Sequence, residues 1–285
     1  MLDEPFERAW CSLLGLAVGD AFGETMAEGD VAKRIAKRLL LRRRPWRWTD
    51  DTAMALSIVE LLGRHGTIDP DALAAAFVRR WQREPDRGYG LGAFQLLHRV
   101  HAGAAWRVEA RGLFGGQGSF GNGAAMRAAP IGAYFALDLE RVRVEALRSA
   151  EPTHAHPDGA AGAVAVAIAA ALATTGIARD ALLGEVIRWT PDSPTRTRLQ
   201  RATELSLDFE LQLREAPGVP EVPAPGPWAA VALAALMTLN SQRPPRLSRP
   251  RGSIRSVRSA HARRRPAVLA ATIRLLEPML RGIRV

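Results

Sequence analysis

Adjacent hydroxyl and carboxylate side chains at residues 48–52, W-T-D-D-T, are the first group in this sequence with types and spacing suited to chemistry. The segment precedes a helical apolar stripe at positions 55, 58, 59 and 62, and Asp51 extends that stripe by one turn. A carboxylate directed inward must be paired, protonated or bound to a metal. Thr49, Asp50 and Asp51 therefore indicate a site for a hard cation such as Mg²⁺. The alternative is helix capping by Thr49, with both Asp residues at the positive end of the helix dipole.

A glycine-containing helical segment at residues 15–24, G-L-A-V-G-D-A-F-G-E, ends in acidic residues. Gly15, Gly19 and Gly23 share one helical face, which is also the pattern of close helix packing. Three glycines cost a helix roughly 1 kcal/mol each, so packing has to compensate for them. Glu24 and Glu28 follow, and both are candidates for proton transfer.

A glycine-rich segment at residues 112–123 holds six glycines in twelve residues and predicts a shaped loop. Residues 116–121 match G-x-G-x-x-G, but that fingerprint needs a preceding strand and a βαβ unit, which the sequence does not predict. Residues 121–127, G-N-G-A-A-M-R, close the loop and open a predicted helix. Backbone N–H groups at such a junction can bind an anion; the alternative is an ordinary surface loop.

Two histidines, His154 and His156, stand in the segment T-H-A-H-P-D (residues 153–158) before a long apolar run. Their i, i+2 spacing could bind a metal or a substrate. The alternative is structural, with neutral imidazoles that cap the following helix.

The elements that must position these groups are helical throughout, because apolar residues recur at helical spacing and alternating strand patterns are nearly absent. We expect an all-α single-domain multi-helix bundle. Residues 160–175 are apolar on all faces but short for a membrane span, which favours a buried central helix. The predicted helices span residues 7–22, 52–64, 70–82, 92–102, 124–135, 139–150, 159–175, 179–189 and 195–213.

Composition and charge narrow the function classes. The chain has 285 residues, one cysteine and a net charge of +10, so an internal disulfide framework is excluded. The segment 241–285 carries twelve Arg and one Glu, whereas the rest of the chain is nearly neutral. A uniformly basic nucleic-acid-binding domain is therefore not predicted, and nucleic acid would bind only through the basic tail. No secretory signal is visible, so we expect a cytoplasmic protein without a membrane partner.

Together the four motifs resemble the ADP-ribosylglycohydrolase family, the relatives of dinitrogenase-reductase-activating glycohydrolase. The resemblance covers residues 7–213 and rests on four patterns in this order: G-x-x-x-G-D-A-x-G, R-W-T-D-D-T-A-M-A-L, G-x-G-N-G-A-A-M-R-x-x-P and T-H-x-H-P. It implies an all-α fold and cleavage of the glycosidic bond at the anomeric carbon of ADP-ribose. The implied partners are an ADP-ribosylated protein or a small ADP-ribose conjugate.

The resemblance also implies roles for individual residues. Thr49, Asp50 and Asp51 would be metal ligands, and the family typically uses two Mg²⁺ (or Mn²⁺) ions. Asp51 and Glu24 would be the catalytic carboxylates, with Glu28 competing for the place of Glu24. The expected substrate-binding residues lie in the glycine-rich loop and after it: Ser119, Gly121, Asn122, Gly123, Met126 and His154.

The C-terminal part departs from the family pattern, which has a second metal motif, G-D-x-D-T, late in the chain. No Asp follows Asp208 here, and a Pro/Arg-rich segment stands in its place. We divide the chain into a family-like domain, 1–216, and a divergent segment, 217–285. The hypotheses are a shifted reading frame between about residues 217 and 240 or a genuine basic arm. Loss of the second metal motif predicts impaired activity, and the alternatives are a non-catalytic ADP-ribose or nucleotide binder and a structural protein.

Overall fold

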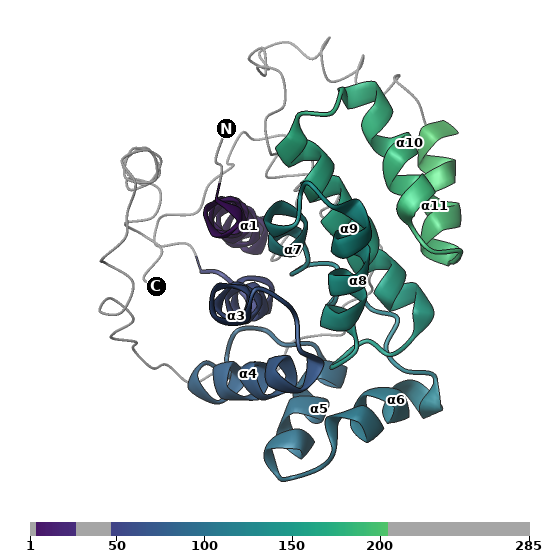
Figure 1. The fold of residues 1–285 in the computed structure, drawn as a ribbon. Coiled ribbons are helices and arrows are strands. Elements are labelled where there is room, and N and C mark those ends of the chain that lie inside the picture. Colours follow the sequence, from purple (N-terminus) through teal and green to yellow (C-terminus); the bar gives the residue numbers. More distant parts are fainter. Residues whose placement is uncertain (1–3, 27–46, 205–285) are drawn as a thin grey trace.

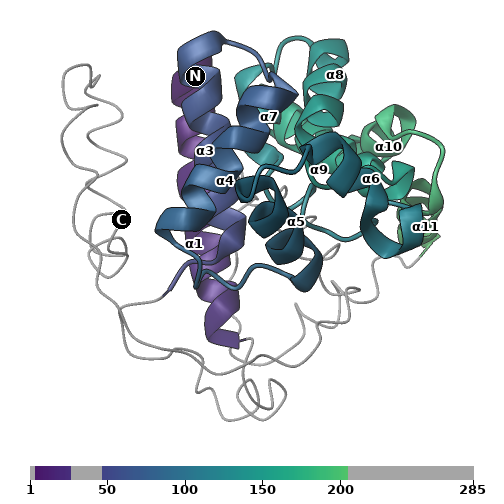
Figure 2. The same ribbon diagram turned by 90° about the horizontal axis from the view of Figure 1, so that it is seen from below.

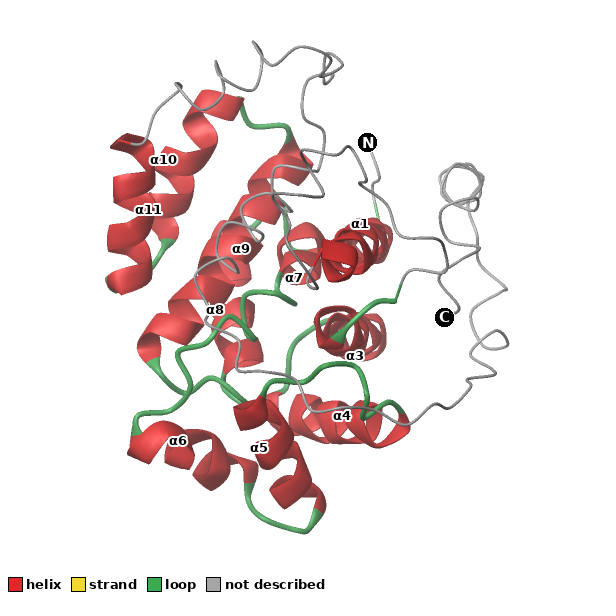
Figure 3. Cartoon of the chain, turned by 180° about the vertical axis from the view of Figure 1, so that it is seen from behind, coloured by secondary structure: helices red, strands yellow, loops and turns green. Residues whose placement is uncertain are grey.

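The computed structural model describes residues 4–26 and 47–204, and within these ranges the chain is all helical, as predicted (Figure 1). The part of the chain described contains no strand, and loops join the helices (Figure 3). The helices are α1 (Pro5–Met26), α3 (Asp50–His65), α4 (Pro70–Arg83), α5 (Leu91–His101), α6 (Trp106–Gly116), α7 (Ala129–Tyr134), α8 (Leu139–Ala150), α9 (Pro157–Thr175), α10 (Arg179–Trp189) and α11 (Pro194–Glu204).

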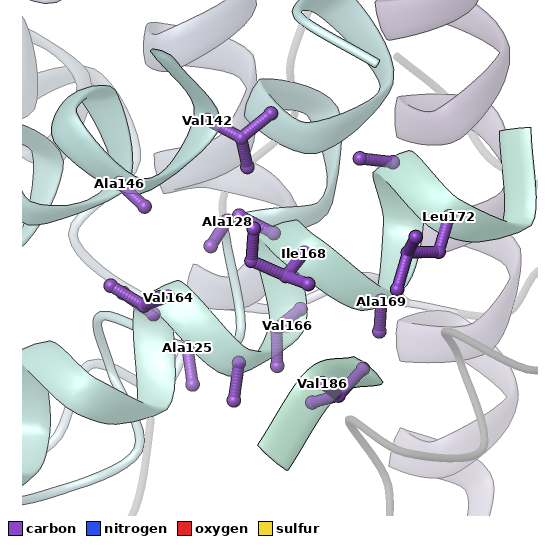
Figure 4. Packing of buried hydrophobic residues seen from close by; sticks show 14 of the residues in the cluster. Ala125, Ala128, Val142, Ala146, Val164, Val166, Ile168, Ala169, Leu172 and Val186 are labelled. Carbon is purple, nitrogen blue, oxygen red and sulfur yellow. The ribbon is translucent and has the colours of Figure 1, made fainter. Parts of the chain in front are cut away.

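Helix α9 is the centre of the fold, as its uniform apolarity predicts. Fourteen of its 19 residues are buried, and α7, α8, α10 and α11 pack around it (Figure 1). Its small side chains let neighbouring backbones approach closely: a Cβ added to Gly132 on α7 would overlap the carbonyl oxygen of Ala167. Valine, isoleucine and alanine side chains from several helices fill the space around α9 (Figure 4). The apolar stretch of α9 is long enough to cross a membrane, but 78% of it is buried inside the fold, as in the core helix of a globular protein.

Helices α1 and α3 run antiparallel beside each other on one side of α7 (Figures 1 and 2). At one end, the ring of Phe6 at the start of α1 covers Gly63 near the end of α3. At the other end, Asp20 of α1 meets Thr49 and Thr52 at the start of α3. The antiparallel pairing therefore brings Asp20, in the motif G-D-A-x-G, to the motif W-T-D-D-T at the start of α3.

Most helix predictions agree with the structure, and residues 139–150 and 179–189 match their helices at both ends. Two predictions need correction. Residues 124–127 form turns and the helix begins only at Ala129, with Pro130 in its first turn, where proline is favoured. The sequence also did not predict α6, and the predicted loop begins at Leu113, where the backbone leaves helical geometry. Helix α11 is described to Glu204, so the predicted continuation to 213 lies outside the described residues, as do segment 217–285 and Glu28.

Candidate active site

The start of α3 carries the Thr49–Asp51 group, and every backbone donor of its first turn has a partner. Thr49 is the N-cap residue, as the capping alternative predicts, and its hydroxyl oxygen accepts from the N–H of Asp51 at 3.4 Å. The Asp50 N–H donates to the carbonyl of Arg87 at 2.8 Å, and the Ala53 N–H donates to the Thr49 carbonyl. These bonds hold a helix terminus rigidly in place, because unpaired N–H groups there would otherwise need water or a ligand.

Asp20 completes this helix terminus from α1. Its Oδ2 accepts from the Thr49 N–H at 2.7 Å, the Thr52 N–H at 3.3 Å and the Thr52 hydroxyl at 2.6 Å. Its Oδ1 accepts from the Thr49 hydroxyl at 2.6 Å. Burial raises the pKa of this carboxyl, and the four hydrogen bonds oppose that rise. Sequence reasoning missed Asp20 as a site residue; the available signal was its place in the motif G-D-A-x-G.

The two adjacent aspartates occupy different environments. Asp50 is buried at 7% exposure, whereas Asp51 is half-buried, although the apolar stripe of α3 predicted Asp51 as the inward residue. The segment after α4 packs over α3 and covers Asp50: Gly88 lies near its Oδ1, and the Asp50 charge raises the pKa of Tyr89, second to the effect of burial. Arg87 lies over the Trp48 ring at 3.3 Å and donates to the Trp48 carbonyl. Asp51 is therefore the better placed of the two to meet a ligand.

The oxygen atoms at this helix start fit one small hard cation. The Thr49 hydroxyl oxygen and Asp51 Oδ1 are 3.3 Å apart. Two neighbouring ligands of an octahedral ion with metal–oxygen distances of about 2.1 Å are about 3 Å apart, so this separation is close to what Mg²⁺ requires. The Thr49 hydroxyl donates its hydrogen to Asp20 and accepts from the Asp51 N–H, which leaves one lone pair of its oxygen for a cation. Within the described residues no group of three His, Cys, Asp or Glu side chains could hold a metal, so this half-site supplies two carboxylates at most.

The glycine-rich loop packs against the His154 ring. A Cβ added to Gly123 would lie 2.6 Å from Cε1 and 2.9 Å from Nε2 of that ring, so the backbone approaches the imidazole as only glycine permits. Gly118 has a positive φ of 75° and lies directly on the backbone of His156. The Ser119 hydroxyl accepts from the Gly121 N–H at 3.3 Å and shapes the turn between them. The structure thus joins the third and fourth motifs.

Exposed aromatic rings flank this loop. Phe114 and Phe120 are each 55% exposed, and their ring centroids are 5.7 Å apart. Phe114 has φ of +53°, an uncommon conformation for a residue with a side chain. The His156 ring lies 5.5 Å from Phe120. Flat apolar rings exposed beside a polar loop suit stacking against a base; their exposure is not visible in the sequence.

The remaining predicted binding residues lie in different places. Asn122 is half-buried in the turn, where its carbonyl accepts from the Met126 N–H. Met126 is 8% exposed and belongs to the core cluster around α3 and α4. His156 caps α9, with Nδ1 accepting from the Asp158 N–H at 3.1 Å, as the structural alternative for the histidines predicts. Glu24 is half-buried on α1, one turn beyond Asp20 and on the same helical face.

Arg127 connects the motifs in the interior. One of its amino groups lies 3.5 Å from the Met54 sulfur on α3. The other donates to the Thr153 hydroxyl at 2.8 Å, and that hydroxyl is 2.7 Å from His154 Nδ1. Burial, followed by the charge of Arg127, lowers the pKa of His154 to about 3, so the imidazole is neutral. A continuous series of contacts therefore runs from Asp20 through α3 and Arg127 to His154 and the loop.

Comparisons with known proteins match this chain to one protein family and its members. The model of the family described as ADP-ribosylglycohydrolase matches residues 1–260. Chicken (Gallus gallus) ADP-ribosylhydrolase ARH3 is 36% identical over 149 residues, which is 51% of this chain and 40% of the chicken protein. ADP-ribosylhydrolase ARH3 of Xenopus tropicalis is 33% identical over 211 residues, 69% of this chain and 59% of that protein. ADP-ribosyl-[dinitrogen reductase] glycohydrolase of Rhodospirillum rubrum is 31% identical over 161 residues, 53% of this chain and 52% of that protein.

A solved structure described as an ADP-ribosylglycohydrolase-related protein complex is 28% identical, with a TM-score of 0.48, and the match covers 83% of this chain and 76% of that one. The chain spans less than two thirds of the length of the three named relatives. The family match itself covers most of the chain and extends past residue 216. By this match, the chain belongs to the ADP-ribosylglycohydrolase family.

Proposed function

We propose that this chain binds the ADP-ribosyl group and hydrolyses the glycosidic bond at its anomeric carbon with the help of a divalent cation, Mg²⁺ or Mn²⁺. The observation that carries the proposal is the convergence of the four motifs. Asp20 anchors Thr49 and Thr52, and Arg127 joins α3 to the segment that bears His154. Family membership supports the same chemistry.

Each part of the site can perform one task in that reaction. The turn at Ser119–Gly123, with its glycine backbone against His154, suits a diphosphate or a ribose. The rings of Phe114 and Phe120 suit the adenine base, because exposed aromatic rings stack on bases without reading their identity. Asp51 in the first turn of α3 and Glu24 near the end of α1 are half-buried carboxylates. A positioned carboxylate can give or take a proton as the glycosidic bond breaks.

The cation would be held by Thr49, Asp50 and Asp51. When bound, it would orient the ribose hydroxyls and lower the pKa of a bound water. The donor set is all oxygen, which suits Mg²⁺ with several waters completing its shell. No Asp follows residue 208, so we propose that the second ion of the family lacks its ligands here and that turnover is impaired.

A non-catalytic ADP-ribose binder is the second candidate function. The absence of any Asp after residue 208 favours it. The loop and His154 do not depend on the missing acidic motif, so binding can persist where turnover is lost. The candidate acceptors of ADP-ribose are arginine, serine, another protein residue, a nucleic-acid end and a small metabolite.

The test is release of free ADP-ribose from ADP-ribosylated protein, followed by mass spectrometry with Mg²⁺, with Mn²⁺ and with EDTA. The wild-type chain should release ADP-ribose only with metal, and Asp51→Asn and Glu24→Gln should release less. ADP-ribose binding without any release would assign the chain to the binders. The proposal would be refuted if the chain neither released ADP-ribose nor bound it.

A further inference from the structure

Arg127 is a buried charge without a carboxylate partner among the described residues. Its side chain is fully buried, and burial lowers the pKa of its guanidinium to about 9, against the opposing charge of Asp50. Buried charged side chains are rare and are normally paired, because removing a charge from water costs several kcal/mol. Ion pairing therefore does not explain this residue.

The described groups that contact the guanidinium are uncharged, and one of them, Thr153, contacts a further functional side chain. One amino group contacts the Met54 sulfur, and the group lies 4.5 Å from the Phe77 ring. The other amino group donates to the Ser149 carbonyl and to the Thr153 hydroxyl, both at 2.8 Å. Among the described residues, Nε has no hydrogen-bond partner. Of these contacts, only the one to Thr153 passes on to another side chain, that of His154.

The donor and acceptor of each hydrogen bond from Arg127 through Thr153 to His154 follow from which groups can donate. An arginine can only donate, so the Thr153 oxygen accepts from Arg127. Thr153 is 1% exposed, and its hydroxyl hydrogen has no recipient in the described part of the chain other than His154 Nδ1 at 2.7 Å. A buried hydroxyl without an acceptor would cost about 1–3 kcal/mol. His154 Nδ1 is therefore the acceptor, and the ring hydrogen stands on Nε2.

Nε2 lies on the side of the ring that meets the loop, because a Cβ added to Gly121 or Gly123 would come within 4 Å of it. We propose that Arg127 is a positioning residue that acts through Thr153 to hold His154 as the neutral imidazole protonated on Nε2, so that a fixed hydrogen-bond donor faces the glycine-rich loop. A ligand atom beside it must then be an acceptor, such as a hydroxyl, carbonyl or phosphate oxygen.

The charged surroundings of His154 agree with a neutral ring. Arg127 faces it from the turn before α7. A pocket of about 260 Å³ reaches His154 and is lined by Arg107 and Arg111 of α6 and by Glu151 after α8. Of these charged groups, Arg127 is the one that lowers the pKa of His154, so a positive charge on the imidazole is disfavoured.

The tautomer can be measured directly by long-range ¹H–¹⁵N NMR of the full chain labelled with ¹⁵N-histidine. The His154 signals are those missing from a His154→Gln variant. The proposal predicts a protonated Nε2 and an unprotonated Nδ1, with the Nε2–H form in about tenfold excess or more, because one buried hydrogen bond is worth about that factor. The pattern should persist to below pH 5, because the pKa of His154 is lowered to about 3.

Two pairs of variants separate positioning from simple packing. Thr153→Val keeps the shape without the hydroxyl and should reduce the Nε2–H excess at least about threefold, whereas Thr153→Ser should keep the wild-type pattern. Arg127→Met should let His154 titrate at a higher pH, and Arg127→Lys should restore part of the difference.

A wild-type ring protonated on Nδ1, or a Thr153→Val spectrum identical to that of the wild type, would overturn the proposal. Because these spectra are recorded without ligand, they remain informative even if the proposed function fails.

Discussion

Removing the Asp20 carboxylate should loosen the start of α3 and, with it, the candidate active site. In Asp20→Ala, four hydrogen bonds disappear, and the N–H groups of Thr49 and Thr52 lose the acceptor that α1 provides. Each unsatisfied buried donor costs about 1–3 kcal/mol, and relief of the buried charge offsets part of the sum. We expect a loss of about 3–5 kcal/mol in the free energy of unfolding. For a chain of this size, that is a fall in Tm of roughly 10 °C.

Asp20→Asn separates the shape of the side chain from its charge. Its amide oxygen can take the place of Oδ2, and the Thr49 hydroxyl can rotate to accept from the amide nitrogen. The expected loss is about 1 kcal/mol, since hydrogen bonds to a charged group are stronger than neutral ones. Asp86→Asn is the matched control, because Asp86 is exposed and should change stability by less than about 0.5 kcal/mol.

The assay is urea unfolding followed by circular dichroism, repeated across acidic pH. Burial raises the Asp20 pKa, so the folded chain keeps this proton to a higher pH than the unfolded chain does. Wild-type stability relative to Asp20→Asn should therefore fall as the pH rises from the ordinary value of 3.8 through the raised pKa. If Asp20→Ala is no less stable than Asp86→Asn, Asp20 does not anchor α3 and the reasoning is refuted.

Three further predictions concern the loop, the buried histidine and the cation. Gly123→Ala places a Cβ against the His154 ring and should cost about 1–3 kcal/mol. The control Gly184→Ala, at an exposed position of α10, should stabilise by about 0.5–1 kcal/mol; equal thermal melts of the two variants would contradict the close approach at Gly123. The pKa of His154 is lowered from 6.5 to about 3. As the pH decreases across that window, the free energy of unfolding should therefore fall more steeply in the wild type than in His154→Gln, by about 1.4 kcal/mol per pH unit. The same pH dependence of stability in both proteins would show that the folded chain protonates this ring normally. Mg²⁺ at ten times its Kd should stabilise the wild type by about 1.4 kcal/mol and Asp51→Asn much less; the same thermal shift in both would place the cation elsewhere.

The sequence predicted those parts of the fold that depend on local pattern. The apolar faces of residues 160–175 predicted the buried position of α9, and Asp69-Pro70 predicted the start of α4. The helix prediction for residues 124–127 was wrong, because α7 begins only at Ala129 with Pro130 in its first turn, and the preceding turn buries Arg127. Helix α6 was missed because three of its eleven residues are glycine and Ala110 is its one buried residue.

The site was predictable only as four separate groups of residues. Thr49, Asp50 and Asp51 are adjacent in sequence, so a local pattern was enough to predict them as one group, with a cation site and helix capping as the two interpretations. Asp20 is 29 residues before Thr49, and no local rule pairs residues that far apart. Arg127 was missed for a different reason: arginine is normally exposed, so its burial follows from tertiary contacts that the sequence does not display.

The measurement that tests the central claim most directly is calorimetric titration of ADP-ribose into the full chain, in Mg²⁺ and in EDTA, with the wild type and Gly123→Ala compared. The account predicts saturable binding at one site, tighter with Mg²⁺ and weaker in Gly123→Ala, because we propose that the loop and the Thr49–Asp51 group belong to a single site. No heat from the wild type, or equal affinity in both proteins whether or not Mg²⁺ is present, would contradict it.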